Sequence, residues 1–544
     1  MTMFRAIFVA FVLSVNSNAW PFTWKSLEST SAFPGLARRY GGLAYVRGQL
    51  CVFGGEGQNG TALSDLFCYN TSSMLWSGLN DGPALYGFVH GYVTRQSRWY
   101  VTHGRNDTAY SSATWAYSFE GDRWMELNTS ALKPRARYGS AGGTYGDQLF
   151  LSMGWSAGGR RLSDTWALNT TSGVWSELAA GGGLNQYNPF LPHARSMHAG
   201  AVAGPDQLVM FSGCASGGQV GGACPLWDTW VLRNTRGSWV WSKLDDDCTA
   251  PRIDGSMVAM DTELLLLLEG STGASSQVLS GSPVIIPSGE VSVLNLTANR
   301  WLRFNTSDVF PLRRGGALVT SHLTTVYMFG GRNESGTFLK DLWKLEVTVD
   351  EISTDVPLGC PALPFSFVHL HGVLMAAAWL LFFPTGALIG RYYRWTWPVW
   401  FVAHIVLQVI GTLLMVCAFV SLLIVSEYSP DFPHAVIGIV LTALTFQQFL
   451  NGILHPCVKR EDGKQSERKG AWRHCWEVYH AVCGVLIIVI GLGQVVLGAL
   501  LVSLSIYLLG LTFGLVTLWF VVFAVHETIF VCYNCFHETS YTKF

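Results

Sequence analysis

The sequence predicts a two-part, multidomain protein: an all-β propeller of six blades, followed by an all-α bundle of five transmembrane helices. Three observations support this prediction. Residues 20–350 are dense in glycine, and their apolar runs are only four to six residues long, which is typical of short strands. A tryptophan closes a repeated unit in that region at intervals of 48 to 66 residues. Beyond residue 364, five apolar segments are each long enough to cross a bilayer.

The composition agrees with a protein that is partly embedded in a membrane. Of the 544 residues, 49% are hydrophobic and only 13% are charged, and the mean hydropathy is +0.28. This composition predicts membrane lipid as a partner, and the formal net charge of -1 predicts no nucleic-acid partner.

Residues 1–19 have the features of a signal peptide. Arg5 supplies the positive start, Ala6–Val15 forms the apolar run, and Ser17-Asn18-Ala19 provides a cleavage site with small residues. The apolar run is too short to span a bilayer. We therefore expect the chain to enter the secretory pathway.

Residues 20–350 repeat one pattern. Each unit opens near a Pro and an Arg, passes through two strands, and ends with Asp-x-Trp or a similar sequence and a closing Trp. The last unit ends at KLEV without a closing Trp, whereas the mature chain would begin with PFTWKSL, a closing strand with no unit before it. We expect this N-terminal strand to complete the last blade and so remove the open edge of the ring. The closing tryptophans are Trp24, Trp76, Trp124, Trp175, Trp241 and Trp301.

The repeat resembles that of kelch-repeat proteins, whose blades have about 50 residues. The resemblance is carried by PGLARRYGG, PRARYGSAGG and PLRRGGALV in the first, third and last units, and by Gly54-Gly55 and Gly330-Gly331. The fifth unit, with LLLLLEGS and a long insertion, matches it least. Kelch propellers are mostly binding scaffolds, so the resemblance implies a protein or glycan ligand for this domain.

Glycosylation sequons and cysteines place the propeller outside the cytoplasm. Eight sequons fall in the propeller and none after residue 365, at Asn59, Asn70, Asn106, Asn128, Asn169, Asn295, Asn305 and Asn333. Disulfides are permitted in such a compartment. We expect Cys51 to pair with Cys68 on a neighbouring strand, and Cys214 with Cys224 across a loop. Cys248 and Cys360 remain as a third pair.

The charges between the apolar segments predict their orientation. Arg391 and Arg394 follow the first helix, and six Lys and Arg residues lie between the third and the fourth. The loop between the second and third helices carries only Glu427 and Asp431. Because positive charge marks the cytoplasmic side, the propeller lies outside and the C-terminus inside. The predicted parts are a signal peptide (1–19), the propeller (20–350), a linker (351–364), the transmembrane domain (365–530) and a cytoplasmic tail (531–544).

Four of the helices carry one histidine each near their N-terminal end. His371 and His434 lie on helices that start outside, and His404 and His480 lie on helices that start inside. The histidines thus form an outer and an inner pair, each able to bind one metal from both sides. Two bis-histidine haem b groups account for all four residues, and such iron transfers electrons because it has no open position.

Other histidines in this region do not fit the pattern. His369 is two residues from His371, about 200° around a helix, so both cannot face one haem. We expect His369 to lie at the interface. His455, His474 and His526 lie in loops or at helix ends, where a structural role is expected.

The same segments resemble the cytochrome b561 family. The matching pieces are HGVLMAAAW and PTGALIGRYYR of the first helix, HIVLQ of the second, HAVIG of the third and WEVYHAVCG of the fourth. The resemblance implies haems between helices one and three and between two and four. It also implies electron flow from cytosolic ascorbate to an outside acceptor, such as ferric iron or an ascorbate radical. Arg391 and Arg394 lie where the family places its cytosolic anion-binding charges; as anchors on the cytoplasmic side they need no ligand.

The sequence therefore predicts an integral membrane oxidoreductase of the plasma membrane or an endomembrane, driven by a cytosolic small-molecule reductant. Glu427 and Asp431 lie where a ferric complex could bind, although solvated loop charges are the better explanation of them. Family members with an outside domain usually carry a β-sandwich there, and this chain departs from them. The alternative is an adhesion or receptor protein in which the helical bundle serves only as an anchor.

Overall fold

A computed structural model describes most of the chain, in two compact units that we treat separately. The described residues are 21–27, 32–181, 191–215, 224–244, 248–271, 289–352, 357–358, 367–423, 433–453, 471–501 and 506–541. The predicted signal peptide, Glu427, Asp431, His455 and Cys360 lie outside these residues.

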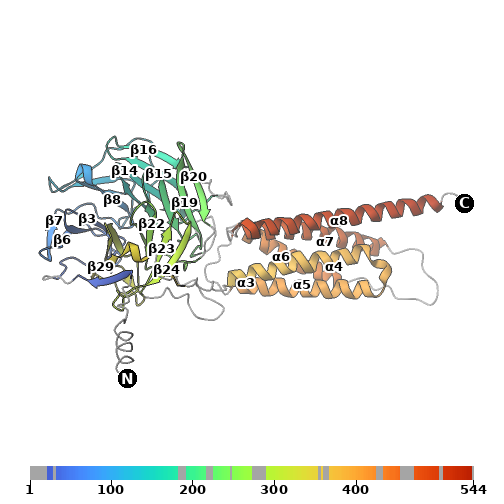
Figure 1. Cartoon of the computed structure of the whole chain (residues 1–544). Helices are drawn as coiled ribbons and strands as arrows, with labels where there is room; N and C mark the ends of the chain where they lie inside the picture. Colours follow the sequence, from blue (N-terminus) through green and yellow to red (C-terminus); the bar gives the residue numbers. More distant parts are fainter. Residues whose placement is uncertain are drawn as a thin grey trace, which may run out of the picture. The chain divides into compact units, whose positions relative to one another are not determined.

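The first unit contains six antiparallel sheets of four main strands each, which are the six predicted blades (Figure 1). Blade one is β3 (Gly42–Val46), β4 (Gln49–Phe53), β6 (Leu66–Asn70) and β7 (Leu75–Leu79). Blade two is β8 (Val89–Val93), β9 (Arg98–Thr102), β10 (Thr114–Ser118) and β11 (Arg123–Glu126), with η1 (Thr94–Gln96) in its first hairpin. Blade three is β13 (Ala141–Tyr145), β14 (Gln148–Ser156), β15 (Arg160–Asn169) and β16 (Val174–Ala179), with β12 (Arg137–Tyr138) paired to β14.

The remaining blades follow the same order. Blade four is β17 (Ala199–Val202), β18 (Gln207–Phe211), β19 (Thr229–Thr235) and β20 (Ser238–Leu244). Blade five is β21 (Ser256–Ala259), β22 (Leu264–Leu268), β23 (Glu290–Asn295) and β24 (Arg300–Asn305). Blade six is β26 (Leu318–His322), β27 (Thr325–Phe329), β29 (Leu342–Val347) and β1 (Phe22–Ser26). Two short ladders join β2 (Arg38–Arg39) to β5 (Glu56–Gly57) and β25 (Arg314–Gly315) to β28 (Arg332–Asn333).

The N-terminal strand completes the last blade, as predicted. Strand β1 pairs antiparallel with β29, with Trp24 opposite Leu345. Since β1 comes from the start of the chain and β29 from the end of the propeller, this sheet ties the first blade to the sixth and leaves the ring without a free edge.

A closed ring of backbone hydrogen bonds also joins the six blades. In each blade, the residue two positions before the first main strand donates its N–H to the carbonyl oxygen of the equivalent residue in the preceding blade, at 2.8 to 3.0 Å. Every member has a left-handed backbone, with φ between 55° and 67°. The members, in order, are Tyr40, Gly87, Gly139, Met197, Asp254 and Gly316. The hydrogen bond from Tyr40 to Gly316 closes the circle. Closure of the propeller therefore does not depend only on the pairing of β1 with β29.

The repeated sequence features are explained by contacts between and within blades. Each closing tryptophan packs into the apolar cluster that its blade shares with the preceding one, as Trp301 does with Phe211 of blade four at 5.2 Å between ring centres. The repeated Arg and the Asp of Asp-x-Trp pair with each other in four blades, through two hydrogen bonds of 2.5 to 2.9 Å. These pairs are Arg38–Asp65, Arg137–Asp164, Arg195–Asp228 and Arg314–Asp341.

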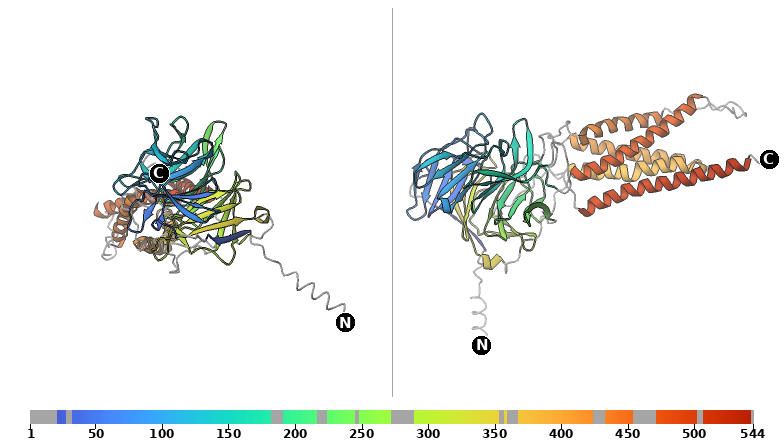
Figure 2. Two further views of the ribbon diagram at one scale, coloured as in Figure 1. Left: turned by 90° about the vertical axis from the view of Figure 1, so that its left-hand side faces the viewer. Right: turned by 90° about the horizontal axis from the view of Figure 1, so that it is seen from above.

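The second unit contains five helices that are long and apolar enough to cross a membrane (Figures 1 and 2). The first span is continuous through α3 (Phe367–Ala377), a π-helical segment η2 (Ala378–Phe382) and α4 (Phe383–Tyr392). The others are α5 (Val399–Leu423), α6 (Pro433–Ile453), α7 (Ala471–Leu501) and α8 (Ile506–Tyr541), while α2 (Val349–Ile352) and η3 (Arg394–Thr396) are short.

The last helix is longer than predicted. We expected the membrane domain to end at residue 530, but α8 continues to Tyr541, so most of the predicted tail is helical. Residues 531–541 contain no Gly or Pro that would end a helix.

Candidate functional site

The structure brings the four intramembrane histidines together as two pairs. His371 on α3 faces His434 on α6, with 6.4 Å between the ring centres. His404 on α5 faces His480 on α7, with 6.5 Å between the ring centres. The distance between ring centres is therefore nearly the same in the two pairs, which are formed by different helices.

This separation fits a metal held between two imidazoles. A metal–imidazole bond is about 2 Å long, and each ring centre lies roughly 1 Å beyond its nitrogen, so two opposed ligands should have ring centres about 6 Å apart. Two rings in direct hydrogen-bond contact would be closer. No larger cluster of His, Cys, Asp or Glu that could hold a metal occurs among the described residues. The donor set, two neutral nitrogen ligands at each place, is that of a bis-histidine haem.

The second nitrogen of two of the rings is held by a backbone carbonyl. Nδ1 of His371 lies 3.0 Å from the carbonyl oxygen of Ala418 on α5. Nδ1 of His404 lies 2.8 Å from the carbonyl oxygen of Gly386 on α4. A proton on Nδ1 directed at a carbonyl leaves Nε2 unprotonated, which is the form that binds a metal.

Glutamines contact the histidines of the other two helices, but only one of them contacts a ring. Gln448 of α6 lies 3.1 Å from Nδ1 of His480, and Gln494 of α7 donates to the backbone carbonyl of His434 at 2.8 Å. Each glutamine is 14 residues beyond the histidine of its own helix. The neighbouring helices α6 and α7 thus each supply a histidine to one pair and a glutamine that contacts the histidine of the other helix.

Glycines make room for the histidine rings on neighbouring helices. A Cβ on Gly390 would lie 2.8 Å from Nδ1 of His404, and a Cβ on Gly498 would lie 3.1 Å from the ring of His434. A side chain at either position would displace the ring.

The space between the two pairs is filled by aromatic side chains. Trp379 lies eight residues after His371, and Gly386, level with His404, lies seven residues after Trp379. The two levels are therefore about 22 Å apart along the helix, with Trp379 midway. Trp379 is buried, its ring is 4.7 Å from that of Phe383, and it occupies the space left by Gly491 on α7. This packing separates the outer pair from the inner pair.

The other histidines take no part in the pairs. His474 is exposed, and Nδ1 of His526 lies 2.9 Å from the carbonyl oxygen of Val522 in its own helix. The side chain of His369 lies outside the described part of the chain. His526 was expected at a helix end or in a loop, but it lies within α8, where it contacts Tyr392 at 5.4 Å between ring centres in a structural role.

The two arginines after the first span differ in their surroundings. Arg391 binds Glu527 of α8 through two hydrogen bonds of 2.6 and 2.8 Å, and the Tyr392 hydroxyl donates to the same carboxylate. Arg394 donates Nε to the carbonyl oxygen of Gly390 and has no salt bridge among the described residues. Both line a hollow of about 290 Å³, together with Tyr392, Trp395 and Phe530. Arg394 is therefore the better placed of the two to bind an anion, a difference that the sequence could not reveal.

In the propeller, the structure contains disulfides Cys51–Cys68 and Cys214–Cys224. Cys248 is also disulfide-bonded. The eight sequon asparagines are all at least partly exposed, so the fold leaves each accessible.

Two family models match this chain in succession. Residues 9–213 match the KLHDC2/KLHL20/DRC7 Kelch-repeats domain, and residues 370–505 match the eukaryotic cytochrome b561 family. The second match contains all four paired histidines.

Individual relatives match one part or the other. An F-box/kelch-repeat protein of Arabidopsis thaliana is 28% identical over 38% of this chain and 44% of its own length. A cytochrome b561 and DOMON domain-containing protein of the same plant is 32% identical over 24% of this chain and 30% of its own. A Drosophila melanogaster protein named as a homologue of ferric-chelate reductase 1 is 29% identical over 16% of this chain and 15% of its own. The chain thus spans less than half the length of each of these relatives.

Proposed function

We propose a function on the premise that this membrane protein joins a kelch-repeat propeller to a cytochrome b561 domain: it carries electrons across the membrane between a cytosolic reductant and an acceptor on the propeller side. The observation that carries the proposal is the pairing of His371 with His434 and of His404 with His480 at 6.4 and 6.5 Å, within a bundle of five apolar helices.

The two histidine pairs would each hold one haem b. A haem held by two histidines supplies one-electron transfer, because both axial positions of its iron are filled. The protein orients the ligands through Ala418, Gly386 and Gln448, and Trp379 with its neighbours excludes water from the space between the pairs.

The direction of transfer follows from the charges. The basic segment after the first helix would face the cytosol, where an anionic reductant such as ascorbate would bind beside Arg394. The acceptor would be ferric iron or an ascorbate radical, which makes the protein an oxidoreductase of the ascorbate-dependent or ferric-reductase type. The propeller would bind or position the acceptor, or dock a protein or glycan. A Drosophila relative named for ferric-chelate reductase 1 supports the iron acceptor.

The test is the absorption spectrum of the purified full-length protein, produced with haem supplied. We expect a b-type spectrum with two haems per chain, which changes to the reduced form when ascorbate is added. A colourless preparation would overturn the proposal and leave the binding function of the propeller as the better account. A spectrum that dithionite but not ascorbate reduces would retain the haems and exclude ascorbate as the donor.

We expect Arg394→Gln to weaken reduction by ascorbate about two- to fivefold at low ascorbate concentration, because one exposed cationic contact is worth up to about 1 kcal/mol. The haem content should not change, since Arg394 does not contact either histidine pair. Arg391→Gln is the matched comparison, because the charge of Arg391 is already compensated by Glu527. An equal effect of the two variants would contradict the assignment of anion binding to Arg394.

A further inference from the structure

Two of the disulfides in the propeller lie in contrasting environments. Cys51 and Cys68 face each other on adjacent strands β4 and β6, and their side chains are 0% and 1% exposed within an apolar cluster. Cys214 and Cys224 lie instead beyond the end of β18 and before β19, and Cys224 is only half-buried. The second disulfide is thus accessible where the first is enclosed.

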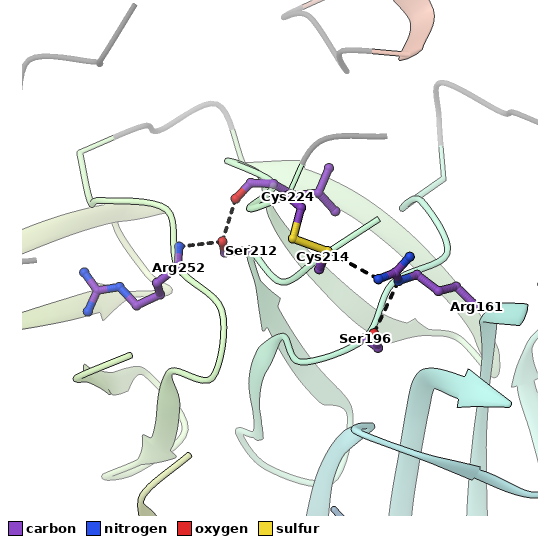
Figure 3. Close-up of a disulfide and its surroundings, with 7 residues drawn as sticks. Arg161, Ser196, Ser212, Cys214, Cys224 and Arg252 are labelled. Atoms are coloured by element: carbon purple, nitrogen blue, oxygen red, sulfur yellow. Dashed lines mark hydrogen bonds between the residues drawn. A yellow bond between two sulfur atoms is a disulfide. The ribbon is translucent and has the colours of Figure 1, made fainter. Parts of the chain in front are cut away.

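A positive charge lies against the second disulfide. Nη2 of Arg161, on β15 of blade three, donates a hydrogen bond to Sγ of Cys214 at 3.3 Å (Figure 3). The guanidinium is fixed by two further contacts: Nε donates to Oγ of Ser196 at 3.3 Å, and the group lies 4.4 Å above the ring of Trp155. Arg161 is 8% exposed, so water screens its charge weakly.

The backbone holds both cysteines in place independently of the bond between them. Cys214 exchanges two backbone hydrogen bonds with Ser196, at 2.9 and 3.1 Å. Two residues after Cys224, Leu226 donates its N–H to the carbonyl oxygen of Gly213 and accepts a hydrogen bond from the Ser212 hydroxyl. The same hydroxyl accepts a hydrogen bond from the N–H of Arg252 (Figure 3). Reduction would therefore leave the two sulfurs close enough to form the bond again.

We propose that Cys214–Cys224 is a redox-active disulfide that exchanges with external dithiols, with Arg161 as its positioning residue. An external thiolate attacks Sγ of the more exposed Cys224, the sulfur–sulfur bond breaks, and Cys214 leaves as a thiolate beside the guanidinium. The second thiol of the reductant then attacks the mixed disulfide and releases Cys224. The net reaction converts one protein disulfide and one dithiol into two cysteines and one external disulfide, with two electrons and two protons transferred.

The cation favours this reaction because it stabilises the thiolate more than the uncharged disulfide sulfur. A thiol beside Arg has a lower pKa and is a better leaving group. The proposal does not depend on the haem centres, since the electrons come from the dithiol. It adds a two-electron site to a protein whose proposed haems transfer one electron each.

The test is a redox titration of the full-length protein with mixtures of reduced and oxidised dithiothreitol, approached from both directions. Free thiols are alkylated and each cysteine peptide is quantified by mass spectrometry. We expect Cys214–Cys224 to be reduced at a lower ratio of reduced to oxidised dithiothreitol than Cys51–Cys68. If dithiothreitol reduced Cys51–Cys68 before Cys214–Cys224 in the wild-type protein, that result alone would overturn the proposal.

Arg161→Gln keeps a hydrogen-bond donor but removes the charge. It should raise the dithiothreitol ratio needed for half-reduction of Cys214–Cys224 about tenfold, equivalent to about one pKa unit of thiolate stabilisation. Arg161→Lys should restore most of the wild-type value. Cys51–Cys68 serves as the internal control, and its unchanged titration shows that the variant is folded. A Gln variant that titrates like the wild type at both disulfides would overturn the role of Arg161.

Discussion

Replacement of a single paired histidine should remove one haem and leave the other in place. We expect His371→Ala or His404→Ala to reduce the haem content of the full-length protein from two per chain to about one, because an axial ligand cannot be replaced by alanine. The double variant should bind none. Haem is measured by the pyridine haemochrome assay against protein concentration. His526→Ala is the matched control, since His526 lies in the same bundle but outside both pairs.

The pairing itself gives a sharper expectation than the haem count. His371→Ala and His434→Ala should remove the same haem and leave identical residual spectra, whereas His404→Ala and His480→Ala should leave the other spectrum. This follows because each ring faces only its partner, at 6.4 and 6.5 Å. If the residual spectra of His371→Ala and His434→Ala differed, the two residues would not share an iron.

The sequence could predict the histidine pairs because depth in a membrane follows from helix order and charge alone. Their orienting groups were missed for a physical reason. Gln494 stands in an apolar helix and Gln448 lies beside Gln447, and their contacts depend on which helix is the antiparallel neighbour. The spacing of 14 residues from His434 to Gln448, and again from His480 to Gln494, was the available signal.

In the propeller, too, the sequence pattern could be predicted but the contacts between its residues could not. The repeat was visible as an Arg near the start of a unit and an Asp-x-Trp near its end, but nothing in a linear pattern shows that they pair. The contacts of blade five explain its weak match: Glu290 stands where four of the other blades have Asp, and it binds Arg303 rather than the repeated Arg252. A change of one carboxylate side chain therefore redirects the contact while the blade keeps its four strands.

Loss of one partner of an Arg–Asp pair should destabilise the propeller strongly, and most at Arg195–Asp228. Arg195 is 0% exposed and Asp228 is 4% exposed, and Trp230 donates to the same carboxylate at 2.6 Å. Asp228→Ala leaves the buried guanidinium unpaired, which should cost about 3–5 kcal/mol in the free energy of unfolding. Urea unfolding of the full-length protein, followed by near-UV circular dichroism, measures this loss.

Asp341→Ala is the matched comparison, because Asp341 makes the same two bonds to Arg314 but its side chain is 38% exposed. Water can then solvate the arginine that remains, so we expect a loss of about 1–2 kcal/mol. Equal losses in the two variants would show that burial does not set the strength of these pairs.

The same pair should make the propeller sensitive to acid. Burial alone would raise the pKa of Asp228, but the charge and hydrogen bonds of Arg195 outweigh it and lower the pKa from 3.8 to about 2. A carboxylate with a lowered pKa stabilises the fold above its unfolded pKa and loses that contribution as the pH falls through its folded pKa. About 2 kcal/mol should therefore be lost between pH 4 and pH 2, and Asp228→Ala should abolish that part of the pH dependence. Wild-type and variant stability curves that remained parallel over this interval would contradict the lowered pKa, because the difference between them is the contribution of this one carboxylate.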